Sequence, residues 1–189
     1  MMPSKDLTLT NCVTGSLLVS TPARSTHPLE ECVIYVYDHS PQIGAQGVVI
    51  NRRSGLTVET LLERMNMHTG SSSLQSPLYH GGLTDENGIL MVHTGEWYSA
   101  NTRPISSELS VSSDTFMLEK LVGGNEPINW LLCAGKCAWK PGELEAELAS
   151  KYWLTVPALD DIVFSALSES KQWRTALNYC AKHTVDTWF

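Results

Sequence analysis

The sequence has no apolar run long enough to cross a membrane as a helix, which takes about 18–20 consecutive apolar residues. Its apolar stretches, such as 32–37, have the length of β-strands. The first twelve residues contain one lysine and no apolar segment, so we expect no secretory leader. These features predict a protein without membrane contact.

Basic clusters are also missing. The chain has 13 Lys and Arg against 20 Asp and Glu, a formal net charge of −7, and its densest basic site is the pair Arg52–Arg53. Nucleic-acid binding depends on clustered cations that neutralise phosphates. We therefore expect no direct nucleic-acid binding.

The cysteines lack the pattern of a disulfide framework or a metal site. There are five, an odd number, at irregular spacing, so we expect reduced thiols in a cytoplasmic protein. Only Cys133 and Cys137 lie close together, whereas structural zinc sites use two close ligand pairs. Neither a Walker motif nor GxGxxG occurs. We expect no metal and no cofactor.

The stretch 131–154 organises the expected fold. It begins with apolar residues 131–134, which are typical of a buried strand, and then reaches Gly135. Pro141–Gly142 would stop a regular element. We therefore expect a compact turn between Gly135 and this dipeptide.

A short helix is expected over 143–150. Glu143 and Glu145 suit the positive end of its dipole, and with Glu147 they are expected on its solvated side. Trp153 follows the helix, and its aromatic surface favours packing against the core.

Short apolar segments bounded by turn residues predict strands, most clearly 32–37, which is rich in β-branched and aromatic residues. The predicted strands are 15–21, 32–37, 46–51, 77–80, 88–93, 109–111 and 161–165. The loop between the second and third is short, which favours an antiparallel pair. Residues 96–107 lack periodicity and are expected to form a surface excursion.

Three further helices are indicated by apolar periodicity and by residues that cap helix ends. The expected starts are Thr57 for a helix to about Met65, Ser112 or Ser113 for a helix to Val122, and Ser168 for the last helix. Strands with interspersed helices and hairpin-length connections predict an α+β fold. At 189 residues the chain fits a single domain over 1–189, in which we expect residues 1–14 to be flexible.

An ordered set of segments resembles the AlgH/YqgE family of bacterial proteins. The segments are 15–22, 33–39, 44–52, 81–82, 88–93, 112–114, 139–148 and 153–154. The resemblance implies an AlgH-like fold, with a largely antiparallel sheet that bifurcates or curls into a small barrel and is flanked by helices. It also implies a bacterial cytoplasmic protein of unsettled biochemistry, with a transcriptional-regulator label.

Polar residues at strand ends are the first candidates for a site. His39, Asn51, Arg52 and His93 could converge with Ser113 to bind an anion, or to place a histidine base near a hydroxyl. The alternative is structural: Asn51 and Arg52 close a turn, His39 satisfies backbone groups, and Ser113 caps a helix.

Gly81, Gly82 and Trp139 are further binding candidates. The glycine pair could instead reflect a positive φ or a close backbone approach. Trp139 could equally be a packing anchor.

Two functional hypotheses remain open. The first is a non-catalytic binding or regulatory protein that acts through a protein partner or small ligand and affects transcription indirectly. The second is a hydrolase or transferase for a small anionic substrate, which uses His39, Asn51, Arg52 and His93. Scattered polar groups would favour the first, and convergence in one pocket would favour the second.

Overall fold

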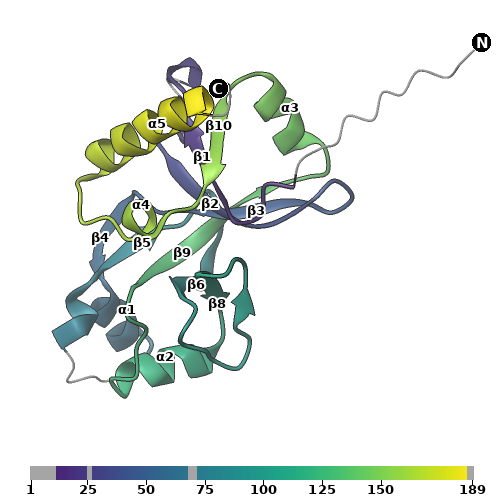
Figure 1. Ribbon diagram of the computed structural model, residues 1–189. Helices are drawn as coiled ribbons and strands as arrows, with labels where there is room; N and C mark the ends of the chain where they lie inside the picture. The colour runs from purple at the N-terminus through teal and green to yellow at the C-terminus, as the bar shows by residue number, and fades with distance from the viewer. Residues whose placement is uncertain (1–11, 25–26, 68–71, 187–189) are drawn as a thin grey trace, which may run out of the picture.

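The computed structural model describes residues 12–24, 27–67 and 72–186 of the chain (Figure 1). The segment expected to be flexible, 1–14, lies outside this part except for its last three residues. Within it, ten strands join one sheet. The strands are β1 (Ser16–Ser20), β2 (Val33–Ser40), β3 (Gly44–Val49), β4 (Arg53–Thr57), β5 (Pro77–His80), β6 (Thr84–Thr94), β7 (Arg103–Pro104), β8 (Leu109–Ser112), β9 (Trp130–Trp139) and β10 (Trp153–Pro157).

Helices flank this sheet, as an α+β fold requires. They are α1 (Val58–Arg64), α2 (Thr115–Val122), α3 (Glu143–Ala149), α4 (Asp160–Val163) and α5 (Glu169–Asp186), with short 3₁₀ turns at Pro22–Arg24 and Ser72–Gln75. Figure 1 shows α3, α4 and α5 around one branch of the sheet and α1 and α2 around the other. No helix in the described ranges is long and apolar enough to cross a membrane.

Strand β9 is the point at which the sheet bifurcates. The strand order is β10-β1-β2-β3-β9-β6-β8-β7, and the additional strand β5 pairs with both β4 and β9. Residues 137–139 of β9 pair with β3, whereas residues 132–134 pair with β5. The β5–β9 pair is parallel and the others are antiparallel. The largely antiparallel, bifurcated sheet is therefore confirmed.

The prediction of a compact turn after Gly135 was wrong, because β9 continues through this glycine to Trp139. Gly135 has φ = 81°, a left-handed conformation that favours glycine. Its ideal Cβ position would lie 3.2 Å from the carbonyl oxygen of Thr84 and 3.3 Å from that of Gly82. The glycine thus bends a continuous strand where neighbouring backbones come close.

The strand expected over 161–165 was also wrong, because this segment contains helix α4. Its neighbouring residues Ile162 and Val163 are both buried. Successive side chains of a strand point to opposite faces, whereas two successive residues of a helix can both face the same core. The backbone N–H groups of both residues donate to the carbonyl of Leu159.

Several elements differ from those predicted from the sequence in their presence or in their first residue. β10 was not expected, and it pairs with β1 over its whole length. β6 begins at Thr84 rather than Gly88, and β7 lies within the expected surface excursion. Asp114, rather than Ser112 or Ser113, caps α2, because its carboxylate accepts the N–H of Met117 at 2.9 Å.

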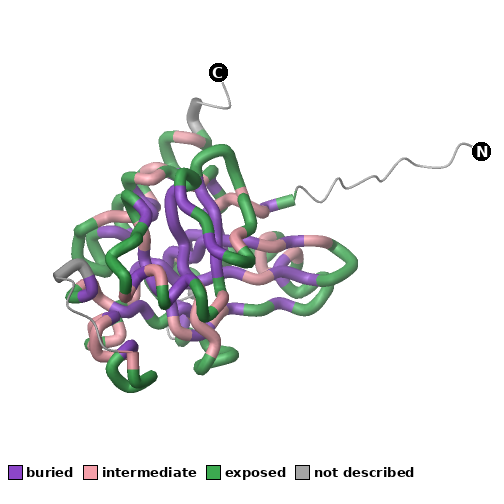
Figure 2. Tube along the Cα trace, turned by 90° about the horizontal axis from the view of Figure 1, so that it is seen from below, coloured by how far each residue is buried: buried purple, intermediate pink, exposed green. Residues whose placement is uncertain are grey.

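Other local predictions are confirmed. Thr57 caps α1, and its hydroxyl accepts the N–H of Thr60. The strands β2 and β3 form the expected antiparallel pair. Figure 2 shows buried residues through the centre of the sheet and exposed residues at the tip of the β2–β3 hairpin.

Candidate functional site

His39 links strand β2 to helix α3 and to the chain before β1. Its Nδ1 atom accepts the N–H of Val13 at 3.1 Å, and its Nε2 atom lies 3.1 Å from Oε1 of Glu145. The imidazole is buried. The expectation that Glu145 is merely solvated was therefore wrong, because its carboxylate holds this histidine.

His93 belongs to a second, separate network under β8. Its Nδ1 atom lies 2.8 Å from the carbonyl oxygen of Thr94, and Nε2 lies 2.9 Å from Oγ of Ser112. The Ser112 hydroxyl also contacts that of Thr102 at 2.6 Å. Burial lowers the pKa of the His93 imidazole because desolvation disfavours its charged form. A neutral ring with its proton on Nδ1 satisfies both contacts.

This histidine–serine pair is enclosed by the core. Both His93 and Ser112 are at most 1% exposed, so the hydroxyl cannot meet a substrate in this conformation. The His93 ring also packs edge-on against Trp97, with 5.1 Å between ring centroids. The network connects β6 to β8, and we interpret it as a structural contact of the core.

Asn51 and Arg52 lie together at a third place, where their polar groups bind backbone. The Asn51 amide accepts the N–H of Val33 at 2.8 Å and donates to the carbonyl of Glu31 at 2.8 Å. The Arg52 guanidinium donates to the carbonyls of Pro28 and Glu30 at 2.6 and 2.7 Å. Both residues line a surface hollow, but their hydrogen bonds hold the backbone of the segment before β2.

The glycine pair marks a close backbone approach, because neither residue has a positive φ. An ideal Cβ at Gly81 would lie 2.1 Å from the carbonyl oxygen of Gly135, and one at Gly82 would lie 2.0 Å from the carbonyl carbon of Lys136. The N–H of Gly81 donates to the carbonyl of Ala134 at 2.7 Å. The pair therefore lets the chain after β5 lie directly against β9.

Trp139 packs in the core beside Trp153, with the rings edge-to-face at 6.4 Å. Both indole N–H groups donate to Oε2 of Glu147, at 3.1 Å from Trp139 and 2.6 Å from Trp153. Glu147 was expected on the solvated side of its helix. Its carboxylate instead joins α3 to β9 and β10.

A different set of residues lines a pocket that we call the notch. It has a volume of about 440 Å³ and lies between the two branches of the sheet. Its lining residues come from β2, β3, β6, β7, β8, β9, the loop before β7 and the link between β8 and α2. They are Tyr37, Gln46, Asp85, Gly88, Ile89, Leu90, Asn101, Arg103, Val111, Ser113, Gly135 and Lys136.

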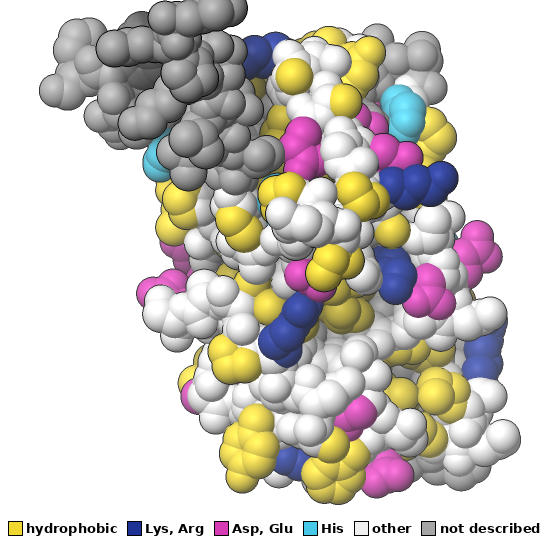
Figure 3. Space-filling model, turned by 90° about the vertical axis from the view of Figure 1, so that its right-hand side faces the viewer, with side chains coloured by type: hydrophobic (Ala, Val, Ile, Leu, Met, Phe, Trp, Pro, Cys, Tyr) yellow, Lys and Arg dark blue, Asp and Glu magenta, His cyan; other side chains and the backbone are white. Residues whose placement is uncertain are grey.

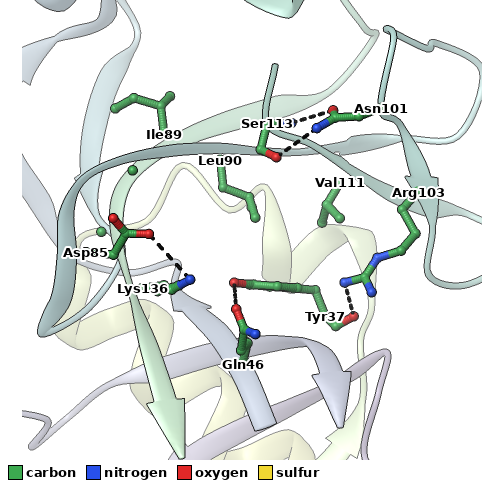
Figure 4. A pocket seen from close by; sticks show the side chains of 12 residues that line it. Tyr37, Gln46, Asp85, Ile89, Leu90, Asn101, Arg103, Val111, Ser113 and Lys136 are labelled. Atoms are coloured by element: carbon green, nitrogen blue, oxygen red, sulfur yellow. Dashed lines mark hydrogen bonds and ion pairs between the residues drawn. The ribbon is translucent and has the colours of Figure 1, made fainter. Parts of the chain in front are cut away.

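Two cationic side chains face the notch from opposite sides (Figure 4). The Arg103 guanidinium donates to the carbonyl of Tyr37 at 2.9 Å and lies 3.4 Å from Oδ2 of Asp38. The Lys136 ammonium lies 3.4 Å from Oδ2 of Asp85. Both ion pairs are partly exposed to solvent.

Between the two cations, the notch has polar and apolar walls. Leu90 and Val111 point into the space between them (Figure 4). Burial raises the pKa of the Tyr37 phenol to about 12, so it stays protonated at neutral pH. Its hydroxyl donates to Oε1 of Gln46 at 3.0 Å.

Of the residues proposed from sequence, Ser113 is the one that lines the notch. Its hydroxyl accepts from Nδ2 of Asn101 at 3.1 Å, and its backbone N–H donates to Oδ1 of Asn101 at 3.0 Å. Tyr37, Arg103 and Lys136 were missed. Arg103 lies in the segment read as a surface excursion, and no local motif connects the three.

The described residues contain no group of three or more His, Cys, Asp or Glu placed to hold a metal ion. All five cysteines lie in the described part as thiols rather than disulfides. Burial raises the pKa of the Cys133 thiol above its usual range, which disfavours the reactive thiolate.

Sequence comparison connects the chain to proteins of matching length. The profile of the family described as AlgH-like matches residues 17–184. A UPF0301 protein of Thioalkalivibrio sulfidiphilus is 32% identical over 172 residues, which cover 90% of this chain and 90% of that protein. A UPF0301 protein of Vibrio vulnificus is 30% identical over 176 residues, which cover 90% of this chain and 93% of that protein.

Solved structures share the architecture. The solution structure of the AlgH protein from Pseudomonas aeruginosa is similar with a TM-score of 0.74 and 28% identity, over 94% of this chain and 92% of that chain. The crystal structure of a protein from Corynebacterium diphtheriae has a TM-score of 0.70 at 21% identity, over 87% and 85% of the two chains, which shows the fold alone. Since the family profile covers nearly the whole chain and relatives above 30% identity align over most of their length, this protein belongs to the AlgH-like family.

Proposed function

We propose that this chain is a non-catalytic binding protein of a regulatory kind, which takes a small anionic ligand in the notch. The observation that carries the proposal is the pair of cations, Arg103 and Lys136, on opposite walls of one pocket. In a chain of net charge −7, two such groups facing one cavity favour an anion there.

The existing partners of these cations leave room for a ligand. Ion pairs that remain exposed to water contribute only about 0–1 kcal/mol. A guanidinium has five N–H donors and an ammonium has three. A ligand carboxylate could therefore bind beside Asp38 and Asp85, or replace them, at little cost.

Binding rather than catalysis is supported by what lines the notch. None of its lining residues is histidine or cysteine. The Ser113 hydroxyl is held by Asn101. The four residues of the hydrolase or transferase hypothesis are distributed over three separate places, with His39 beside α3, His93 under β8, and Asn51 with Arg52 before β2. Their distribution gives the enzyme hypothesis no support.

In this proposal any effect on transcription is indirect. A ligand that fills the notch contacts strands from both branches of the sheet. A protein partner would then recognise the ligand-bound form of this chain. The acidic charge and the lack of a basic stripe argue against direct contact with nucleic acid. A cytoplasmic location remains a prediction from the sequence.

Titration of the ¹⁵N-labelled protein with benzoate, a small carboxylate with an apolar body, tests the proposal. We expect chemical-shift changes centred on the notch, and at least a tenfold weaker affinity in Arg103→Gln or Lys136→Gln. Lys171→Gln removes the same charge from the exposed face of α5 and should leave the affinity unchanged. Shift changes away from the notch, or equal weakening in all three variants, would show that the anion does not bind there.

A further inference from the structure

A second hollow opens next to the notch, near the tip of the β2–β3 hairpin. It has a volume of about 410 Å³, and we call it the apolar hollow because Ile43, Ala45, Ala138, Trp139 and Pro141 line much of it. Gln46 lines both this hollow and the notch. The two spaces are therefore neighbours across one side chain.

We propose that the notch and the apolar hollow form one elongated site for a linear aliphatic carboxylate. The carboxylate head lies between Arg103 and Lys136, and the hydrocarbon tail passes Gln46 into the apolar hollow. This inference rests on the proposed function, because it takes the notch as the site of the anionic head.

The strand register supports a continuous path. Side chains two residues apart on a strand point to the same face, so Lys136 in the notch and Ala138 in the hollow share one face of β9. Gln46 pairs directly with Ala138 across the β3–β9 ladder. Thr84 lines the hollow and the next residue, Asp85, lines the notch.

The side chains of Lys136 and Ala138 lie on the face of β9 opposite the one that packs against α3. Ala45 and Trp139, which also border the hollow, belong instead to the core cluster on the α3 side. Cys137, whose side chain points away from Ala138, belongs to the core cluster that includes Leu144 of α3. Ala138 itself is exposed, and Ile43 at the hairpin tip is 77% exposed. Figure 3 shows hydrophobic and charged side chains next to each other around a hollowed centre on this side of the molecule.

The charge distribution fixes the direction of the ligand. Arg103 and Lys136 are at the notch end, so a carboxylate is favoured there. At the hollow end, the lining cation Lys140 lies with two carboxylates. Asp38 faces Arg103, and Glu143 accepts the backbone N–H of Lys140 at 2.7 Å. A tail without polar groups leaves these contacts intact and covers Ala138 and Ile43.

Isothermal titration of the full chain with acetate, butanoate, hexanoate and octanoate, each below its micelle concentration, tests the inference. Burial of one methylene is worth about 0.8 kcal/mol, or about a fourfold gain in affinity. We expect gains of about this size for the carbons that reach the apolar hollow. Ala138→Glu should abolish the dependence on chain length and Ile43→Ser should reduce it. Leu167→Ser, an exposed leucine before α5, should leave it unchanged.

The outcomes separate this inference from the proposed function. If benzoate binds in the notch but affinity does not rise with chain length, the elongated site is wrong and the notch remains an anion site. A rise that survives Ala138→Glu and Ile43→Ser places the tail elsewhere and also overturns the inference. If no carboxylate binds, both proposals fail.

Discussion

Asp160 carries a poorly solvated carboxylate at the start of α4. Its Oδ1 atom is buried and has no hydrogen-bond partner among the described protein atoms. Burial raises its pKa, and the negative charges of Glu108, Asp161 and Glu96 raise it further. The charged form is therefore less stable in the folded protein than in the unfolded chain.

We expect Asp160→Asn to increase the free energy of unfolding at pH 7 by about 1 kcal/mol, since it removes a partly buried charge. The folded-state pKa lies above the unfolded value of about 3.9. The charged Asp160 carboxylate lowers the free energy of unfolding. This loss of stability is absent below the unfolded pKa and grows as pH rises towards and through the folded pKa. Urea unfolding should thus show that Asp160→Asn is more stable than the unmodified protein at pH 7, and that this difference decreases towards pH 4.

Asp161→Asn is the matched control, because it removes the same charge from the neighbouring, exposed position. It should stabilise the protein less. An equal gain in both variants would mean that overall charge, rather than the burial of Asp160, explains the effect.

At the start of helix α2, the charged form of Asp114 is stabilised by folding, in contrast to that of Asp160. The Asp114 carboxylate accepts hydrogen bonds from the N–H of Met117 at 2.9 Å, the hydroxyl of Ser99 at 2.7 Å and the N–H of Asn101 at 3.2 Å. Burial acts to raise its pKa, but these hydrogen bonds outweigh burial and lower it. The charged carboxylate thus stabilises the start of the helix.

Asp114→Ala should decrease the free energy of unfolding at pH 7 by about 2 kcal/mol, because it removes a helix cap and two further hydrogen bonds. Since the folded pKa is below the unfolded value of about 3.9, this contribution is present above that value. It is lost as pH falls through the folded pKa, so the two proteins should converge in acid. Urea unfolding from pH 7 to pH 3 measures this.

Ser113→Ala tests the alternative cap that the sequence indicated. Its contacts are exposed, so we expect a change within about 0.5 kcal/mol. A larger loss in Ser113→Ala than in Asp114→Ala would assign the cap to the serine.

Helix α3 depends on the two tryptophans that meet at Glu147. Trp153→Ala and Trp139→Ala should each cost about 3–5 kcal/mol, as large aromatic truncations in cores do. Glu143→Gln should cost at most about 1 kcal/mol through a weaker helix-dipole interaction, because the amide oxygen can still accept the Lys140 N–H. Thermal or urea unfolding of the three variants provides the comparison. If Trp139→Ala kept full stability but lost carboxylate binding, its indole would be a ligand contact instead of an anchor.

At the scale of the whole molecule, the net charge of −7 predicts weak interaction with polyanions. We expect no specific binding of duplex DNA at physiological salt. A mobility-shift titration up to about 1 µM protein, with competitor DNA, measures this. A shift in the sub-micromolar range that survives the competitor would instead support direct action as a regulator.

Elements that depend on local chemistry could be predicted from the residues along the chain. β-branched and aromatic residues define β2, Thr57 caps α1 through its own hydroxyl, and Gly123 ends α2. The ordered motifs also identified the family and its bifurcated sheet. The individual elements need only residues that are neighbours in the chain, whereas the family and its sheet follow from the resemblance of an ordered set of segments between 15 and 154.

The bends of the chain and the contacts between distant side chains depend on how the strands pair, which no local segment specifies. Gly135 reads as a turn residue, but pairing with β6 on one edge of β9 and with β3 and β5 on the other extends the strand through it. Tyr37, Arg103 and Lys136 form the notch because β2, β7 and β9 come together through the β-ladders. Strand pairing between distant segments leaves no periodic trace in any one of them, and for this physical reason the site could not be found by reading along the chain.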